Sequence, residues 1–76
     1  MALWWLVHEI EGERRVMIRE DTNMFFAQVK AAIDGFGGRF VEAHPLDAKT
    51  AKRIPKRMVG RTLTADEAAA LLDRLA

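Results

Sequence analysis

The chain has 76 residues, no cysteine and a formal net charge of +1 at pH 7. This length allows a single domain, and the missing cysteines exclude a disulfide or a thiolate metal site as its support. A near-neutral charge indicates no class of partner by itself. Because a core of this size supplies only about 3–5 kcal/mol, we expect well-capped helices or self-association to add stability. The absence of cysteine is typical of a cytoplasmic protein.

The N-terminal part of the sequence predicts an antiparallel hairpin. Residues 3–10 and 14–20 are rich in strand-forming types, and the segment 11–13 between them carries a glycine suited to a tight turn. The apolar start lacks a basic region, so we interpret it as a strand and not as a signal peptide. No stretch approaches the ~18–20 apolar residues that cross a bilayer, so we expect no membrane partner.

The register of this hairpin depends on the length of its loop. A loop of two residues, 11–12, places Val7 opposite Val16 and stacks apolar side chains across the strands. A loop of three residues would shift that pairing by one position. We favour the shorter loop because it also leaves Glu9 facing Arg14 beside the exposed turn.

The favoured register divides the hairpin into two faces. Trp4, Leu6 and Met17 lie on one face, and Trp5 and Val7 lie on the other, because successive side chains of a strand alternate. One face is expected to pack on a helix. The other is either covered by the last helix of the chain or exposed as an interface for another protein. Trp4, Leu6 and Met17 are therefore the candidate protein-interface residues.

Residues 21–36 predict a central amphipathic helix with both ends marked. Residues 21–23 offer short side-chain oxygens that can cap its first turn. Gly35, Gly37 and Gly38 supply the positive φ with which a helix stops. Apolar side chains recur at spacings of three and four, which predicts a buried stripe of Phe25, Val29, Ala32, Ile33 and Phe36.

The middle of the chain predicts shorter elements. Residues 40–43 form a third strand, which ends before a proline that cannot donate to a ladder. Asp47 can cap a short helix over 48–54, and the next proline should stop that helix. Residues 56–63 show no clear period and predict a loop or a short edge strand through 58–59.

The last helix is predicted over residues 65–75. The segment 64–67, Thr-Ala-Asp-Glu, has the form of a capping box, in which the cap and the third helical residue satisfy each other's backbone N–H groups. Leu63 precedes the cap and can pack on Ala68. A helix this short is marginal alone in water, so its leucines must dock on the rest of the fold.

Together these elements predict one α+β domain that spans residues 1–76. It has a small three-stranded, mostly antiparallel sheet with helices packed on it, in the order β-β-α-β-α-α. The central helix should pack on one face of the sheet, and the last helix beside it or over the other face. The expected core comprises Trp5, Val7, Val16, Ile18, Phe25, Val29, Ile33, Phe40, Leu71, Leu72 and Leu75.

Few residues indicate catalysis. The sequence lacks a Gly-rich phosphate loop with a lysine, a nucleophile elbow and any cysteine. His8, Glu42 and His44 would suit zinc if the third strand paired beside the first. A histidine at a strand end and a single polar position in an apolar strand are more often structural. We therefore expect no catalytic residue, no metal and no cofactor.

The most distinctive feature is a basic segment that spans residues 49–61. The sequence has 12 basic and 11 acidic residues, and six of the cations but no acid fall in this segment, so the remainder is net acidic by five. Spacings of three and four place several cations on one side of the short helix, where they could track phosphates or meet an acidic partner. The segment has no aromatic residue for stacking on bases. Its candidate binding residues are Lys49, Lys52, Arg53, Lys56, Arg57 and Arg61.

A resemblance to a known family also indicates contact with nucleic acid. Residues 60–68, Gly-Arg-Thr-Leu-Thr-Ala-Asp-Glu-Ala, followed by Leu71 and Leu72, resemble a segment of the C-terminal repeats of bacterial type IA DNA topoisomerases. The resemblance covers residues 60–72 and consists mainly of a capping box and leucines. It implies a DNA-associated module and assigns no role to any residue.

The sequence thus predicts a small non-enzymatic binding module whose basic segment contacts nucleic acid or an acidic partner. The alternative is a protein–protein adaptor or inhibitor, in the form of a homodimer, that uses the apolar hairpin face around Trp4. The basic segment would then be a solvated surface. An enzyme would require His8, Glu42 and His44 to converge on one face.

Overall fold

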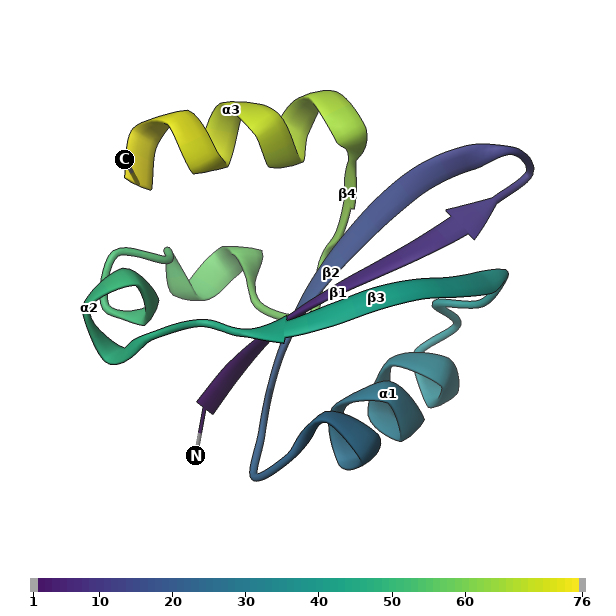
Figure 1. The fold of residues 1–76 in the computed structure, drawn as a ribbon, viewed down its shortest axis with the longest axis horizontal. Helices are drawn as coiled ribbons and strands as arrows, with labels where there is room; N and C mark the ends of the chain where they lie inside the picture. Colours follow the sequence, from purple (N-terminus) through teal and green to yellow (C-terminus); the bar gives the residue numbers. More distant parts are fainter. Residues whose placement is uncertain (1, 76) are drawn as a thin grey trace.

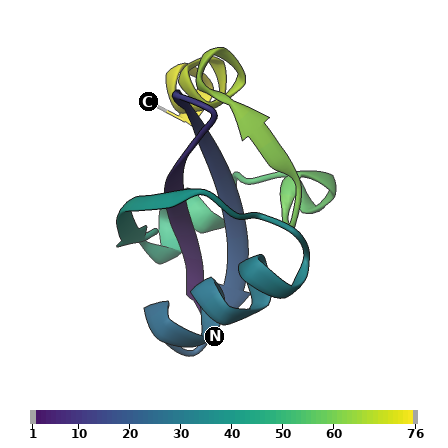
Figure 2. The ribbon, with the colours of Figure 1, turned by 90° about the vertical axis from the view of Figure 1, so that its right-hand side faces the viewer.

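The computed structural model describes residues 2–75 and contains a four-stranded antiparallel sheet with helices on both faces (Figures 1 and 2). The strand order across the sheet is β3-β1-β2-β4. Helix α1 packs on one face, and α2 and α3 pack on the other. Along the chain the elements are β1 (Ala2–Ile10), β2 (Glu13–Asp21), α1 (Met24–Ile33), β3 (Arg39–Pro45), α2 (Ala48–Ala51), the 3-10 helix η1 (Lys56–Met58), β4 (Thr62–Thr64) and α3 (Ala65–Leu75).

The α+β class is confirmed, but the sheet has four strands where three were expected. The additional strand, β4, lies at 62–64 and pairs with β2, with Leu63 opposite Val16. The expected edge strand through 58–59 is reduced to a single parallel bridge between Val59 and Ile18. A strand of three residues is too short for an alternating pattern to show in the sequence.

The hairpin register with the two-residue loop is confirmed. Val7 pairs with Val16, and Glu9 pairs with Arg14. Both loop residues have positive φ, Glu11 at 54° and Gly12 at 78°, which is typical of the type I′ turns that match the twist of a hairpin. On its other side β1 pairs with β3 in antiparallel fashion, and a bulge interrupts that ladder.

The sheet carries a separate apolar core on each face. The larger core lies under α3 and α2, and the smaller one lies under α1. Figure 1 shows α3 and α1 on opposite sides of the strands. The larger core contains Leu3, Trp5, Val7, Val16, Ile18, Ile54, Leu63, Ala68 and Leu71. The smaller core contains Leu6, Met17, Ala27, Ala31 and Phe36.

The prediction that Trp4, Leu6 and Met17 form an exposed interface is wrong. Leu6 and Met17 are 0% and 2% exposed, because the central helix α1 covers this face and not the face of Trp5. Trp4 is half-buried beside them, and its Nε1–H donates to the carbonyl of Asp21 at 3.2 Å. The chain passes from β2 directly onto this face, so α1 occupies the position that was expected of the last helix.

The core prediction is wrong for five side chains, most of them on α1. Helix α1 contacts the sheet through Ala27 and Ala31, which are four residues apart and fully buried. Two alanines at this spacing allow the helix backbone to lie close to the sheet, which turns the large apolar side chains outward. The expected core residues that are exposed are Phe25, Val29, Ile33, Phe40 and Leu72.

Helix α1 ends in a Schellman motif that returns the chain to the small core. Gly35 has φ 91°, its N–H donates to Ala32, and the N–H of Phe36 donates to Ala31 at 2.8 Å. Phe36 is thereby buried against the alanines of α1. Gly37, in contrast, does not have the positive φ that was expected of it.

Gly38 is required by the close approach of β3 to β1. Its φ is 84°, and a Cβ at this position would lie 2.4 Å from the carbonyl oxygen of Glu9.

The start of α3 is as predicted. The N–H of Thr64 donates to Glu67 Oε1, and the N–H of Glu67 donates to Thr64 Oγ1, both at 3.1 Å. Within residues 2–75 no helix is both long enough and apolar enough to cross a membrane.

Candidate functional site

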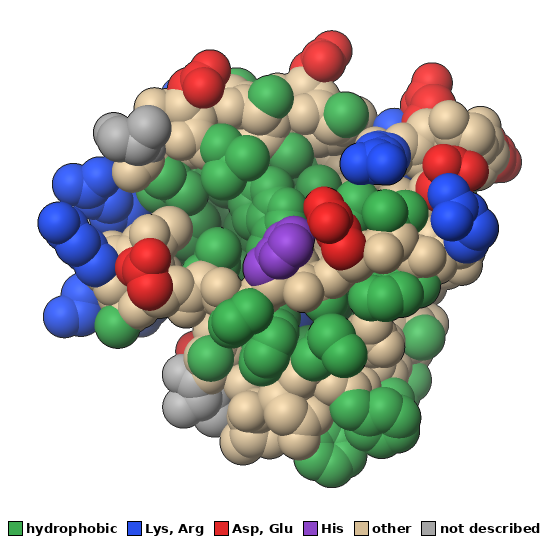
Figure 3. Space-filling model, viewed as in Figure 1, with side chains coloured by type: hydrophobic (Ala, Val, Ile, Leu, Met, Phe, Trp, Pro, Cys, Tyr) green, Lys and Arg blue, Asp and Glu red, His purple; other side chains and the backbone are tan. Residues whose placement is uncertain are grey.

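The cations of the basic segment are all exposed, whereas Ile54 between them is buried in the larger core. The segment begins on α2, passes through η1 and ends in the loop before β4. Figure 3 shows Lys and Arg side chains gathered at the end of the molecule where α2 lies. Helix α2 is shorter than the 48–54 expected, because the residues after Ala51 continue in tighter turns toward Pro55. The exposed cations are Lys49, Lys52, Arg53, Lys56, Arg57 and Arg61.

The cations of the basic segment differ from those elsewhere in their partners. Of the six Lys and Arg residues outside the segment, four form ion pairs: Arg15–Glu13, Arg19–Asp34, Lys30–Asp21 and Arg39–Glu9. Within residues 2–75 no ion pair includes a cation of the basic segment. Arg53 instead donates to the carbonyl of Leu75 at 3.0 Å. The positive charge of this segment is therefore not neutralised by pairing within the described chain.

Three carboxylates have lowered pKa values, and all three have structural partners. The Lys30 ammonium, 2.7 Å from the Asp21 carboxylate, and the N–H of Thr22 hold the pKa of Asp21 below its ordinary value. The N–H of Thr50 lowers the pKa of Asp47, the N-cap of α2. The N–H of Thr64 likewise lowers the pKa of Glu67. These groups stay ionised near neutral pH and serve helix ends and one ion pair.

The two histidines lie on opposite faces of the sheet. Although β3 does pair beside β1, His8 lies on the α1 face, with its ring centroid 4.4 Å from that of Phe36 and its Nδ1 3.0 Å from the Gly37 carbonyl. His44 pairs with Trp5, on the α3 face, where its Nε2 lies 3.5 Å from Glu42. The three residues do not converge, and no metal-binding group of three or more ligand side chains occurs within residues 2–75.

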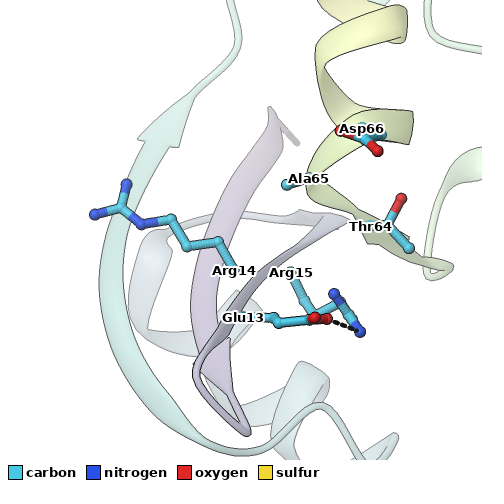
Figure 4. A pocket seen from close by; sticks show the side chains of 6 residues that line it. All are labelled: Glu13, Arg14, Arg15, Thr64, Ala65 and Asp66. Carbon is cyan, nitrogen blue, oxygen red and sulfur yellow. Dashed lines mark ion pairs between the residues drawn. The ribbon is translucent and has the colours of Figure 1, made fainter.

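A shallow hollow of about 450 Å³ lies between the hairpin end and the start of α3 (Figure 4). Glu13 and Arg15 form an ion pair at 2.8 Å inside it, and Arg14 points away from the other labelled side chains. The hydroxyl of Thr64 already caps α3. Glu13, Arg15 and Thr64 are thus used by the fold, and the lining side chains do not combine a nucleophile with a base.

Comparison of the chain with protein-family models, with curated proteins and with solved structures finds no match. The resemblance of residues 60–72 to topoisomerase repeats therefore gains no support. In the structure the Thr and Glu of that segment form the cap of α3, and Leu63 and Leu71 are core residues. A local helix cap and its leucines account for the shared pattern.

An apolar surface on the outer side of α1 was not predicted from the sequence. We call it the α1 patch and define it by four side chains directly opposite the buried alanines: Phe25, Phe26, Val29 and Ile33. Phe25 and Ile33 are 64% and 78% exposed, and the rings of Phe25 and Phe26 contact edge to face at 5.6 Å. Figure 3 shows hydrophobic side chains over this part of the molecule. A second stripe of alanines on the same helix was the signal that could have revealed it.

Proposed function

We propose that the protein is a small non-enzymatic module that binds nucleic acid through contacts of the basic segment with the phosphate backbone. The observation that carries this proposal is the difference in pairing. The six exposed cations of the segment have no ion pair within residues 2–75, whereas most cations elsewhere do. Lysine and arginine that are free of carboxylate partners can neutralise phosphates and release the condensed counterions.

The composition of the segment favours backbone contact over base readout. It holds no aromatic side chain for stacking and no Asn or Gln for reading adenine in a groove. Its helical parts, α2 and η1, have four and three residues, which gives little helix to place in a major groove. Binding is therefore expected to depend strongly on salt and little on sequence.

The test is binding to a mixed-sequence DNA duplex, measured by fluorescence anisotropy over a series of salt concentrations. The test variant is Lys52→Ala/Arg57→Ala, and the charge-matched control is Arg14→Ala/Arg74→Ala, which removes two exposed cations outside the segment. The wild-type chain should bind at low salt and release at high salt. Removing two phosphate contacts should reduce the slope of log K against log salt by about 2, whereas the control should keep the wild-type slope.

Two outcomes contradict this proposal. One is a duplex that fails to bind the wild-type chain even at low salt. The other is an equal loss of binding in the two double variants, because net charge and not the basic segment would then explain the interaction.

A second candidate function, a protein–protein adaptor, is supported on a different surface from the one that the sequence indicated. The hairpin face around Trp4 is covered by α1, but the apolar side chains of the α1 patch are exposed. The α1 patch and the basic segment lie on opposite sides of the sheet, so a protein on the patch would leave the basic segment uncovered.

A further inference from the structure

The α1 patch is large for a chain of this size. Phenylalanine side chains present ~200 Å² each, so the exposures of 64% and 49% at Phe25 and Phe26 amount to roughly 230 Å². Val29 and Ile33, at 41% and 78%, raise the total to roughly 400 Å² of apolar surface, which equals the largest patch of a typical monomer, a patch that is often functional. The patch alone is about half of the ~800 Å² that each partner of a standard interface buries.

The patch has the geometry of a helix–helix contact. Phe25, Val29 and Ile33 are spaced by four residues and form one ridge along α1. Ridges of this spacing pack into the grooves of an identical helix at a crossing angle of about −50°. Ala32, small and exposed, borders the ridge and leaves room beside it for a side chain of another helix. If a two-fold axis passes through Val29, Phe25 meets Ile33 of the partner subunit.

The charges at the border of the patch favour a second copy as the occupant. Lys30 is paired with Asp21 at 2.7 Å, and Arg19 is paired with Asp34 at 2.6 Å, so the charges flanking α1 are neutralised within the chain. In a two-fold interface each surface meets itself, and any unpaired charge would face its own copy. A strongly charged partner would find no unpaired charge at this border to attract it. A second copy of the chain would meet no electrostatic repulsion there.

From these observations we propose that the α1 patch is a self-association surface, on which α1 of a second copy of this chain packs across a two-fold axis near Val29. A chain of 76 residues has a small core, and burial of this patch supplies apolar contact that the monomer lacks. The dimer leaves both basic segments uncovered, because α2 and η1 pack on the opposite face of the sheet.

The experiment is sedimentation equilibrium of the full chain over a range of protein concentrations, at low and at high salt. The wild-type chain should reach twice the monomer mass with a dissociation constant that changes little with salt. Val29→Asp places two like charges at the axis and should weaken the dimer at least a hundredfold. Since Val29 is 41% exposed, circular dichroism should show an unchanged fold. Leu72→Asp, at an apolar side chain of α3 that is 48% exposed, is the matched control and should keep the wild-type dissociation constant.

A mixing experiment distinguishes the two-fold arrangement from any other use of the patch. Val29→Lys should be monomeric like Val29→Asp, and an equimolar mixture of the two should recover at least a tenfold tighter association, because opposite charges then meet at the axis. A wild-type chain that stays monomeric at millimolar concentration would overturn the proposal. A dimer that survives Val29→Asp but is lost in Leu72→Asp would also overturn it and assign the contact to α3. Neither result bears on the binding of duplex DNA, which is measured independently.

Discussion

Helices α1 and α3 have nearly the same length, but they bury different kinds of side chain against the sheet. Each has two buried residues, Ala27 and Ala31 on α1, and Ala68 and Leu71 on α3. Helix α3 directs Leu71 at the core, and its charged residues are exposed. Helix α1 directs alanines at the core and phenylalanines at solvent. The larger apolar stripe of a helix therefore does not have to be the buried one when a second stripe of small residues permits a closer approach to the sheet.

The comparison is tested most strongly by trimming one large side chain on each helix. Leu71→Ala removes a side chain that is 4% exposed and should lower the free energy of unfolding by about 2–5 kcal/mol. Ile33→Ala removes a side chain that is 78% exposed and should change it by less than ~0.5 kcal/mol in the monomer. Urea denaturation at a protein concentration below the dimer range measures both. Equal losses would mean that α1 buries its large stripe after all.

Enlarging an alanine of α1 tests the close approach of this helix to the sheet. Ala27→Leu inserts a bulky side chain where α1 lies closest to the sheet and should cost about 1–3 kcal/mol through overpacking. Ala32→Leu adds the same atoms on the exposed side of the helix and should be close to neutral. Thermal denaturation compares the two variants with wild type. A neutral Ala27→Leu would show that the alanines do not set the distance between helix and sheet.

The smallest expected effect concerns the ion pair that fixes α1 to β2. Because the pKa of Asp21 is lowered from 3.8, its contribution to stability is present above that pH and is lost as the pH falls through the folded-state pKa. Asp21→Asn should therefore flatten the loss of stability below pH 4, measured by urea denaturation at a series of pH values. Lys30→Met should do the same in part, since it removes the first cause of the shift while the N–H of Thr22 remains. If both variants lost stability below pH 4 as steeply as the wild-type chain, Asp21 would not contribute through its ion pair with Lys30.

Local signals in the sequence were sufficient for the hairpin register and for the start of α3. Both depend on residues close in the chain: a two-residue loop that aligns Val7 with Val16, and a capping box whose partners are three residues apart. The extra strand β4 could not be predicted from the sequence, because three residues are too few to show a period. The side of α1 that faces the sheet could not be predicted either, because periodicity identifies the apolar stripes of a helix and not which stripe is buried.

In the candidate binding surfaces, too, features set by neighbouring residues could be predicted, whereas features set by distant contacts could not. The basic segment could be located from the sequence because its cations are contiguous, but the pairing of the other cations depends on contacts such as Arg39–Glu9, thirty residues apart. The separation of His8 from His44 depends on which side of β1 and β3 each residue points to. Leu6 and Met17 were assigned to a common face, and only the placement of α1 decided that this face is internal.

The bulge between β1 and β3 has a consequence for how copies of this chain can join. Strand β3 forms one edge of the sheet, and an open edge is a template on which other chains add strands and aggregate. The bulge interrupts its regular geometry, Pro45 offers no backbone donor, and Arg39 and Glu42 place charges along it. Growth by strand addition is thereby disfavoured at this edge. An exposed helix, which closes a pair and cannot propagate a sheet, is the safer route to association for such a small sheet.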